Sequence, residues 1–78
     1  MTINSIYNKL DSLRDAIDEL IGDLEEKQSS IEDHACEMDR DMTDKEQERY
    51  DEIDEKMSAL RECFDNIEYA MGNIEEWA

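Results

Sequence analysis

Large apolar residues recur at alternating steps of three and four along both halves of the chain. The series runs from Ile3 to Met38 in the first half and from Tyr50 to Ile74 in the second. This spacing fills the a and d positions of a heptad repeat, and a repeat sustained this long is typical of a coiled coil. The pattern therefore predicts two long helices, the first over about residues 3–38 and the second over about 44–77.

The apolar positions of the two halves match when the chain is folded back on itself. A single register pairs nearly all of them, since each step forward along one arm is a step back along the other: Leu10 with Ile74, Leu13 with Met71, Ile17 with Ile67, Leu20 with Phe64, Leu24 with Leu60, and Ile31 with Ile53. We therefore predict an all-α fold, a single domain over residues 1–78 that forms an antiparallel two-helix hairpin. The core of so short a chain is small, which favours dimerisation into a four-helix bundle.

The heptad phase breaks between Met38 and Tyr50, where the change matches no whole number of heptads. Within this gap Thr43 is followed three residues later by Glu46, the spacing of a capping box at the start of a helix. We expect the turn at about residues 39–43, although it contains no glycine. The alternative is one continuous helix in a dimer.

Acidic residues outnumber basic ones by 24 to 8, which gives a net charge of −16. Nucleic acids and anionic membranes are polyanions, so neither is expected as a direct partner.

The first 13 residues contain neither a basic leader nor an unbroken apolar run. Cys36 and Cys63 would lie about 20 Å apart along the hairpin, too far for a disulfide. We therefore expect free thiols and a cytoplasmic protein.

The residues beside the seam differ between the two sides of the predicted hairpin. On one side Lys9 faces Glu75 and Asp23 faces Arg61, and these opposite charges favour the antiparallel register. The other side, formed by e positions of the first arm and g positions of the second, contains no acidic residue. Its apolar and small members predict a dimer flank: Tyr7, Ile21, Ala35, Cys63, Ala70 and Trp77. The alternative is that Tyr7 and Ile21 only widen the two-helix core.

Most carboxylates occupy the outer positions of both arms. This predicted partner-binding acidic face consists of Asp11, Asp15, Asp18, Glu19, Glu25, Glu26, Glu32 and Asp33 on the first arm, and Glu48, Asp51, Glu52, Glu55, Glu62 and Asp65 on the second. Neighbouring carboxylates on a helix face lie about 5–6 Å apart, comparable to phosphates along a nucleic-acid strand. The general design is similar to the small acidic inhibitors that phages and other mobile elements use against restriction, CRISPR or recombination nucleases. That resemblance implies a basic nucleic-acid-binding protein or nuclease complex as partner. The alternative is that the acidic exterior only keeps the hairpin soluble.

Catalytic, cofactor and metal sites are not expected. His34 falls at a d position opposite Tyr50, where we expect it to fill a core layer. The series Asp39, Asp41, Thr43 resembles the start of a calcium loop, but the required glycine and final glutamate are missing. Neither cysteine has a histidine partner.

The sequence thus predicts a non-enzymatic DNA mimic that acts as an inhibitor, in the host cytosol if phage-encoded. The competing hypothesis is a structural or adaptor coiled coil that self-associates or binds a partner helix through the acid-free flank.

Overall fold

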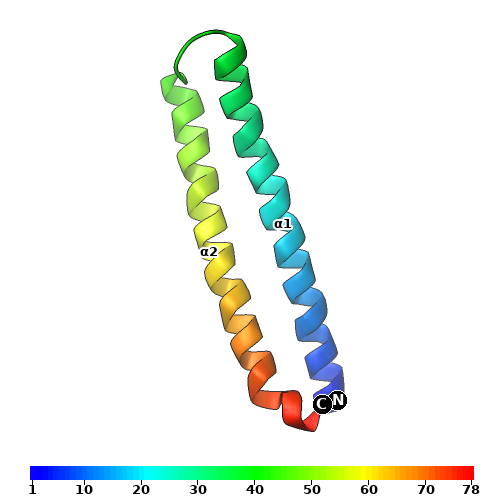
Figure 1. Cartoon of the computed structure of the whole chain (residues 1–78). Coiled ribbons are helices and arrows are strands. Elements are labelled where there is room, and N and C mark those ends of the chain that lie inside the picture. The colour runs from blue at the N-terminus through cyan, green and yellow to red at the C-terminus, as the bar shows by residue number, and fades with distance from the viewer.

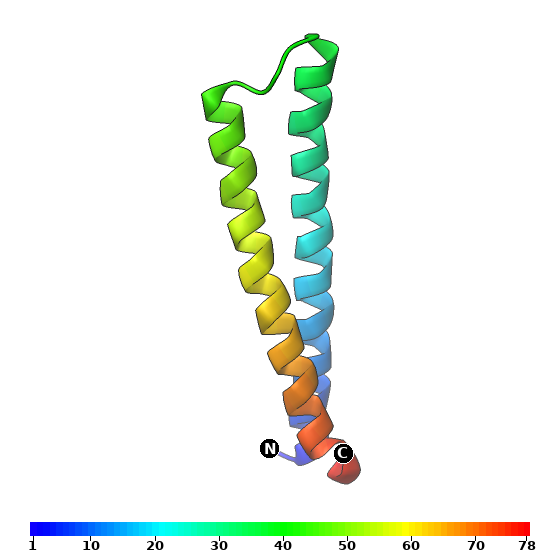
Figure 2. The same cartoon turned by 60° about the vertical axis from the view of Figure 1, so that its left-hand side comes forward.

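The computed structural model describes all 78 residues as a helical hairpin (Figure 1). Helix α1 (Ile3–Glu37) and helix α2 (Asp44–Ile74) run antiparallel, and a short 3-10 turn, η1 (Glu75–Trp77), follows α2. The molecule is a rod with extents of 56 × 16 × 15 Å. Figures 1 and 2 place both termini at the same end and show the helices winding slightly around each other, as coiled-coil helices do. The predicted hairpin is therefore confirmed, and the alternative of one continuous helix is wrong.

Helix α1 ends in a Schellman motif that uses aspartate where glycine is usual. Asp39 adopts the left-handed conformation, with φ of 51°. Its N–H donates to the Cys36 carbonyl at 3.0 Å, and the N–H of Arg40 donates to the Ala35 carbonyl at 3.2 Å. These two bonds satisfy carbonyls that the end of a helix would otherwise leave unpaired. Since aspartate tolerates this conformation better than most residues, the chain turns here without a glycine.

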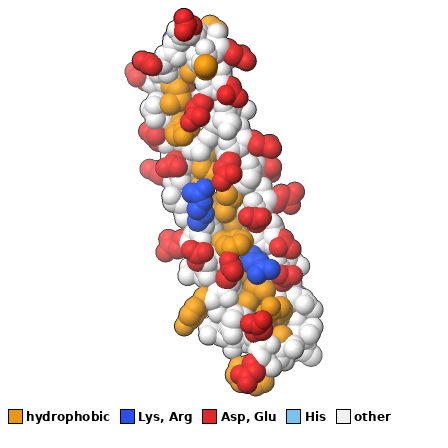
Figure 3. Space-filling view, viewed as in Figure 1, with side chains coloured by type: hydrophobic (Ala, Val, Ile, Leu, Met, Phe, Trp, Pro, Cys, Tyr) orange, Lys and Arg blue, Asp and Glu red, His pale blue; other side chains and the backbone are white.

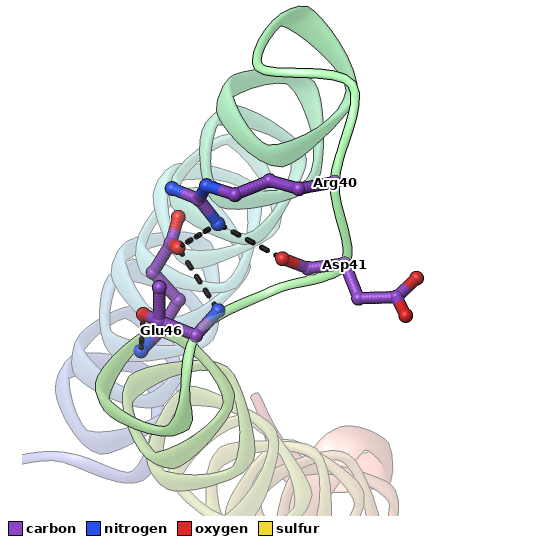
Figure 4. Close-up of polar contacts among 4 residues, drawn as sticks. Arg40, Asp41 and Glu46 are labelled. Atoms are coloured by element: carbon purple, nitrogen blue, oxygen red, sulfur yellow. Dashed lines mark hydrogen bonds and ion pairs between the residues drawn. The ribbon is translucent and has the colours of Figure 1, made fainter.

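Helix α2 begins with the capping box that the sequence predicted. The N–H of Glu46 donates to the Thr43 hydroxyl at 3.2 Å, and the N–H of Thr43 donates to the Glu46 carboxylate at 3.1 Å. Arg40 completes the turn by donating to that carboxylate at 2.7 Å and to the Asp41 carbonyl at 2.9 Å (Figure 4). The backbone hydrogen bond from Thr43, together with Arg40, lowers the pKa of Glu46 to about 2. The turn is thus held by charge-assisted hydrogen bonds.

The core lies along a single seam between the two helices. Its buried members are Ile17, Ile21 and Leu24 of α1 with Met57, Ile67 and Met71 of α2, and five half-buried side chains pack against them: Tyr7, Leu10, Ile53, Leu60 and Phe64. The a-position register agrees with the sequence prediction, since Leu24 and Leu60 line one hollow and Ile31 and Ile53 line another. Gln28 is also buried, and its side-chain amide donates to the Tyr50 carbonyl at 3.1 Å.

The prediction was wrong about which positions of α1 pack against α2 together with the a positions. The heptad pattern predicted that the d positions would belong to this core. The seam takes the e row, with Ile21, Gln28 and Ala35 buried, and leaves the d row outside. Leu13 and Leu20 are 50% and 46% exposed, and His34 is exposed rather than a core layer. The physical reason is that the d row turns polar after Leu20, at Lys27 and His34. From Ile21 onward the e row supplies Ile21, Gln28 and Ala35, none of which is ionisable, so burying it costs less.

The predicted ion pairs across the seam, Lys9 with Glu75 and Asp23 with Arg61, are not formed. Arg61 pairs instead with Glu25, at 3.2 Å. Because the e positions of α1 are buried, the seam is bordered on that side by the b positions of α1, which include Glu25. Glu25 therefore meets Arg61, and Asp23 lies on the opposite side of α1.

Candidate functional site

The hairpin has two long faces of different chemistry, one on each side of the seam. On the first, a hollow is lined by Leu20, Leu24, Lys56, Ala59 and Leu60. On the second, a hollow is lined by Asp18, Ile21, Glu25, Arg61, Phe64 and Asp65. The rows of α1 and α2 that border each hollow extend along the whole rod, because successive members lie seven residues apart. We call the first the low-acid face and the second, with the outer surfaces that adjoin it, the acidic face.

The low-acid face comprises two rows of each helix. The first row of α1 consists of Ile6, Leu13, Leu20, Lys27 and His34, and the second consists of Lys9, Ala16, Asp23, Ser30 and Glu37, preceded by the N-cap Thr2. The first row of α2 consists of Arg49, Lys56, Cys63 and Ala70, followed by Trp77 in η1, and the second consists of Lys45, Glu52, Ala59, Asn66 and Asn73. These rows hold three of the 24 acidic residues, against five of the eight basic residues. Charge is therefore segregated between the two faces and is not spread evenly around the rod.

The residues predicted as a dimer flank are divided by the structure. Ile21 and Ala35 are buried within the hairpin and Tyr7 is half-buried in its core, so these three present little free surface. The other three lie on the low-acid face: Cys63 and Trp77 are exposed, and Ala70 is half-buried. The rows that were expected to meet on one flank thus lie on different sides of the seam.

The apolar surface that the hairpin leaves exposed was not identified from the sequence. Ile6, Leu13 and Leu20 form a row on α1 and are each between 40% and 50% exposed. They had been assigned to the core because they occupy d positions. The signal that would have found them is the continuation of that row as Lys27 and His34, which a two-helix seam would have had to bury.

The acidic face is an exposed array of carboxylates with few intramolecular partners. All of its 14 predicted members are exposed except Asp11, which is half-buried, and one of them, Glu52, lies on the low-acid face beside Lys56. Only three of them form ion pairs within the chain: Asp11 with Arg14, Glu25 with Arg61, and Glu52 with Lys56. Figure 3 shows one face of the rod, with acidic side chains along both helices and few basic ones among them. The other carboxylates form no ion pair within the chain, although Asp51 accepts a hydrogen bond from Gln47 and Glu32 accepts one from Tyr50.

The densest part of this array is the beginning of α2. One shallow hollow there is lined by acidic residues alone: Asp44, Glu48, Asp51, Glu52 and Glu55. Of these, only Asp44 was absent from the predicted face. Tyr69 was also missed; it is 74% exposed and lies in the outermost row of α2, seven residues after Glu62 and seven before Glu76 of η1. An exposed aromatic side chain among carboxylates is suited to contact a basic protein surface, where tyrosine often contributes strongly to binding.

Other chemistry finds little support in the geometry. No group of three or more His, Cys, Asp or Glu side chains is placed to hold a metal ion. Cys36 and Cys63 are both free and exposed. Hydrogen bonding to Glu32, together with its negative charge, raises the pKa of Tyr50. This keeps the Tyr50 hydroxyl protonated and does not make it a proton-transfer group near neutral pH.

Comparisons of the chain with protein-family models, with curated proteins and with solved structures found no match. Neither helix contains a stretch long and apolar enough to cross a lipid bilayer.

Proposed function

We propose that this chain is a non-enzymatic acidic inhibitor that acts as a homodimer in the cytoplasm. Its acidic face would mimic nucleic-acid phosphates and occupy the basic cleft of a nucleic-acid-binding protein, such as a host defence nuclease in anti-CRISPR or anti-restriction inhibition by a phage. The observation that carries the proposal is the excess of carboxylates without partners on the acidic face. An acidic exterior needed only for solubility would be expected to include lysines that relieve repulsion, whereas 11 of the 14 predicted carboxylates form no ion pair within the chain.

The density of charge supports the same function. A net charge of −16 along a 56 Å rod corresponds to one net negative charge per roughly 3.5 Å. A single strand of B-form DNA carries one per about 3.4 Å, and the duplex one per about 1.7 Å. One hairpin therefore matches a single strand, and two hairpins side by side approach the duplex. Because the helices hold their carboxylates on a rigid rod, binding to Arg and Lys would need little reordering of the backbone.

The proposal is tested by identifying a partner and asking whether nucleic acid displaces it. The tagged chain is used to capture proteins from a host lysate at about 50 mM and about 500 mM salt, and each captured protein is purified. We expect a basic nucleic-acid-binding protein that is retained only at low salt and is released by duplex DNA. A partner held equally at both salt concentrations and unaffected by DNA would contradict mimicry.

Two single substitutions provide a matched comparison between the faces. Glu55→Lys and Glu37→Lys make the same change of charge, on the acidic and the low-acid face respectively, and both side chains are exposed. We expect Glu55→Lys to weaken partner binding several-fold more than Glu37→Lys. Reversing Asp18, Glu25, Asp51 and Glu55 together should abolish inhibition. Equal effects of the two single substitutions would mean that net charge alone matters and that no particular face is used.

A second candidate function is supported by a separate observation. The exposed apolar row Ile6, Leu13 and Leu20, together with Trp77, would suit a structural or adaptor coiled coil that binds a partner helix on the low-acid face. For that function, Leu13→Asp should abolish capture of the partner, and the four acid reversals should leave it nearly intact.

A further inference from the structure

The hairpin leaves its apolar surface only partly covered. Just eight of the 78 residues are buried, and no side chain is fully enclosed. Ile6, Leu13 and Leu20 are 40%, 50% and 46% exposed on one face, with Trp77 65% exposed in η1, just beyond α2. A continuous apolar row bordered by polar groups marks a surface that contacts another molecule.

We propose that a second copy of this chain covers the low-acid face, packed antiparallel about a two-fold axis that passes α1 at Ala16. In this arrangement α1 lies against the partner's α1 and α2 against the partner's α2, giving a four-helix bundle. The inference rests on the homodimer of the proposed function but not on its inhibitory activity. It names the surface and the symmetry, neither of which the charge segregation alone determines.

The charges of α1 are self-complementary about this axis. Lys9 and Asp23 occupy the same row as Ala16, one seven residues before it and the other seven after it. A two-fold axis at Ala16 therefore places Lys9 opposite the partner's Asp23, and Asp23 opposite the partner's Lys9. In a symmetric interface every such contact occurs twice. The small side chain of Ala16 at the centre allows the two helices to approach closely, with the leucines of the neighbouring row packed on either side.

The same axis suits α2. In the observed register Ala16 lies level with residue 68, within about two residues of the midpoint between Cys63 and Ala70. An axis at that midpoint sets Cys63 against the partner's Ala70, so small side chains again meet at the centre. Lys56 then faces the partner's Trp77, an arrangement in which an ammonium group contacts an indole ring. Both helices thus indicate one position of the axis independently.

Other dimers fit the face less well. A two-fold axis along the rod would instead set α1 against the partner's α2. Because Lys27 and Lys56 lie at nearly the same level of the hairpin, each Lys27 would then face the partner's Lys56, which is repulsive. Packing through the acidic faces would be more unfavourable still. The overlap is about 40 Å long and the rod is 16 Å wide, which gives roughly 1,300 Å² of buried surface in total, within the range of stable interfaces.

Disulfide cross-linking tests the geometry. The variants are made in the full chain with Cys36→Ser, so that Cys63 is the only native thiol, and are oxidised mildly. Because Cys63 and its own copy lie about 10 Å apart along the bundle, we expect little cross-linking with Cys36→Ser alone. Adding Ala70→Cys should give a covalent dimer in most molecules. Replacing both native cysteines with serine while keeping Ala70→Cys should again give little.

A charge exchange tests the self-complementarity of α1. Lys9→Asp or Asp23→Lys alone should raise the dimer dissociation constant about five- to tenfold at low salt, as measured by analytical ultracentrifugation, because each creates two like-charged contacts. The double variant Lys9→Asp/Asp23→Lys should return to within about twofold of the native value. Circular dichroism should show unchanged helicity, since both side chains are exposed.

The possible failures are distinguishable. A dimer that cross-links efficiently through Cys63 alone, or a double variant that does not recover, would overturn this interface and leave inhibition untouched. A native chain that remains monomeric at about 100 μM would overturn both this interface and the homodimer of the proposed function. Loss of partner binding in the acid-reversed variants with intact cross-linking would support inhibition and the interface separately.

Discussion

The two ends of the hairpin are held together by different interactions. Toward the termini and the middle, the helices are joined by apolar side chains, with Ile17, Ile67 and Met71 buried between them. Toward the turn Met57 is buried near a polar side chain, Gln28, and the connection itself is held by Arg40 and Glu46. The half near the termini is therefore stabilised by apolar burial alone, whereas directed hydrogen bonds supplement burial in the half near the turn.

The largest effect is expected from breaking the apolar half. Met71 is 4% exposed, so Met71→Ala should lower the free energy of unfolding by about 2–4 kcal/mol, through lost burial and the cavity left behind. Urea unfolding followed by circular dichroism, at one fixed protein concentration, measures this. Tyr69→Ala is the control, since Tyr69 is 74% exposed and should change stability by less than about 0.5 kcal/mol. Similar losses in both variants would show that the seam is not the main source of stability.

A smaller loss is expected at the polar half. Gln28→Ala removes the bond to the Tyr50 carbonyl and leaves unfilled space, which should cost about 1–2 kcal/mol. Gln28→Met keeps the volume without the hydrogen bond, and should change stability by less than about 1 kcal/mol while loosening the register of the two helices. Hydrogen exchange of the amides of α2 measures the register, and equal protection in Gln28→Met and the native chain would contradict this role.

The helices and their register could be predicted because both depend on heptad spacing. Pairs across the seam, such as Leu24 with Leu60, follow from the heptad spacing of the two arms. The capping box of Thr43 and Glu46 follows from local sequence alone. The rotation of α1 about its own axis could not be read in the same way. Both the d and the e rows carry apolar residues near the terminus, so the choice between them depends on polar residues further along, at Lys27 and His34.

That rotation also decided the candidate site. It buried Ile21 and Ala35, exposed Leu13 and Leu20, and so moved the apolar surface from one side of α1 to the other. The acidic face was less sensitive, because outer positions stay outer under a rotation of one row. Predicted site residues on the outer rows therefore remained exposed, while the α1 residues of the predicted dimer flank, Tyr7, Ile21 and Ala35, did not.

Low pH should destabilise the half of the hairpin near the turn, because it protonates Glu46. Its pKa in the folded chain, about 2, lies below the ordinary value of 4.5. The stabilisation from this carboxylate is therefore complete above about pH 4.5 and is lost as the pH falls toward 2. We expect Glu46→Gln to be less stable than the native chain at pH 7, with the difference disappearing by about pH 2. Glu55→Gln is the control, because it removes a charge from the acidic face without touching the turn.

Thermal unfolding of both variants over this range of pH measures the difference. Glu55→Gln should be slightly more stable than the native chain at pH 7, since it relieves repulsion between neighbouring carboxylates. If Glu46→Gln behaved in the same way, the hydrogen bonds of Glu46 would contribute nothing beyond its charge.

The smallest effect is expected from easing the backbone at the turn. Asp39 holds a φ of 51°, which an L-residue adopts at some cost and glycine adopts freely. Asp39→Gly should therefore raise the free energy of unfolding by about 0.5 kcal/mol, the relief of strain slightly exceeding the larger chain entropy that glycine brings to the unfolded state. Asp39→Ala removes the same charge without easing the backbone, and should be less stable than Asp39→Gly. If both variants gained equally, the benefit would come from removing one negative charge, and the turn half would be limited by repulsion rather than by backbone geometry.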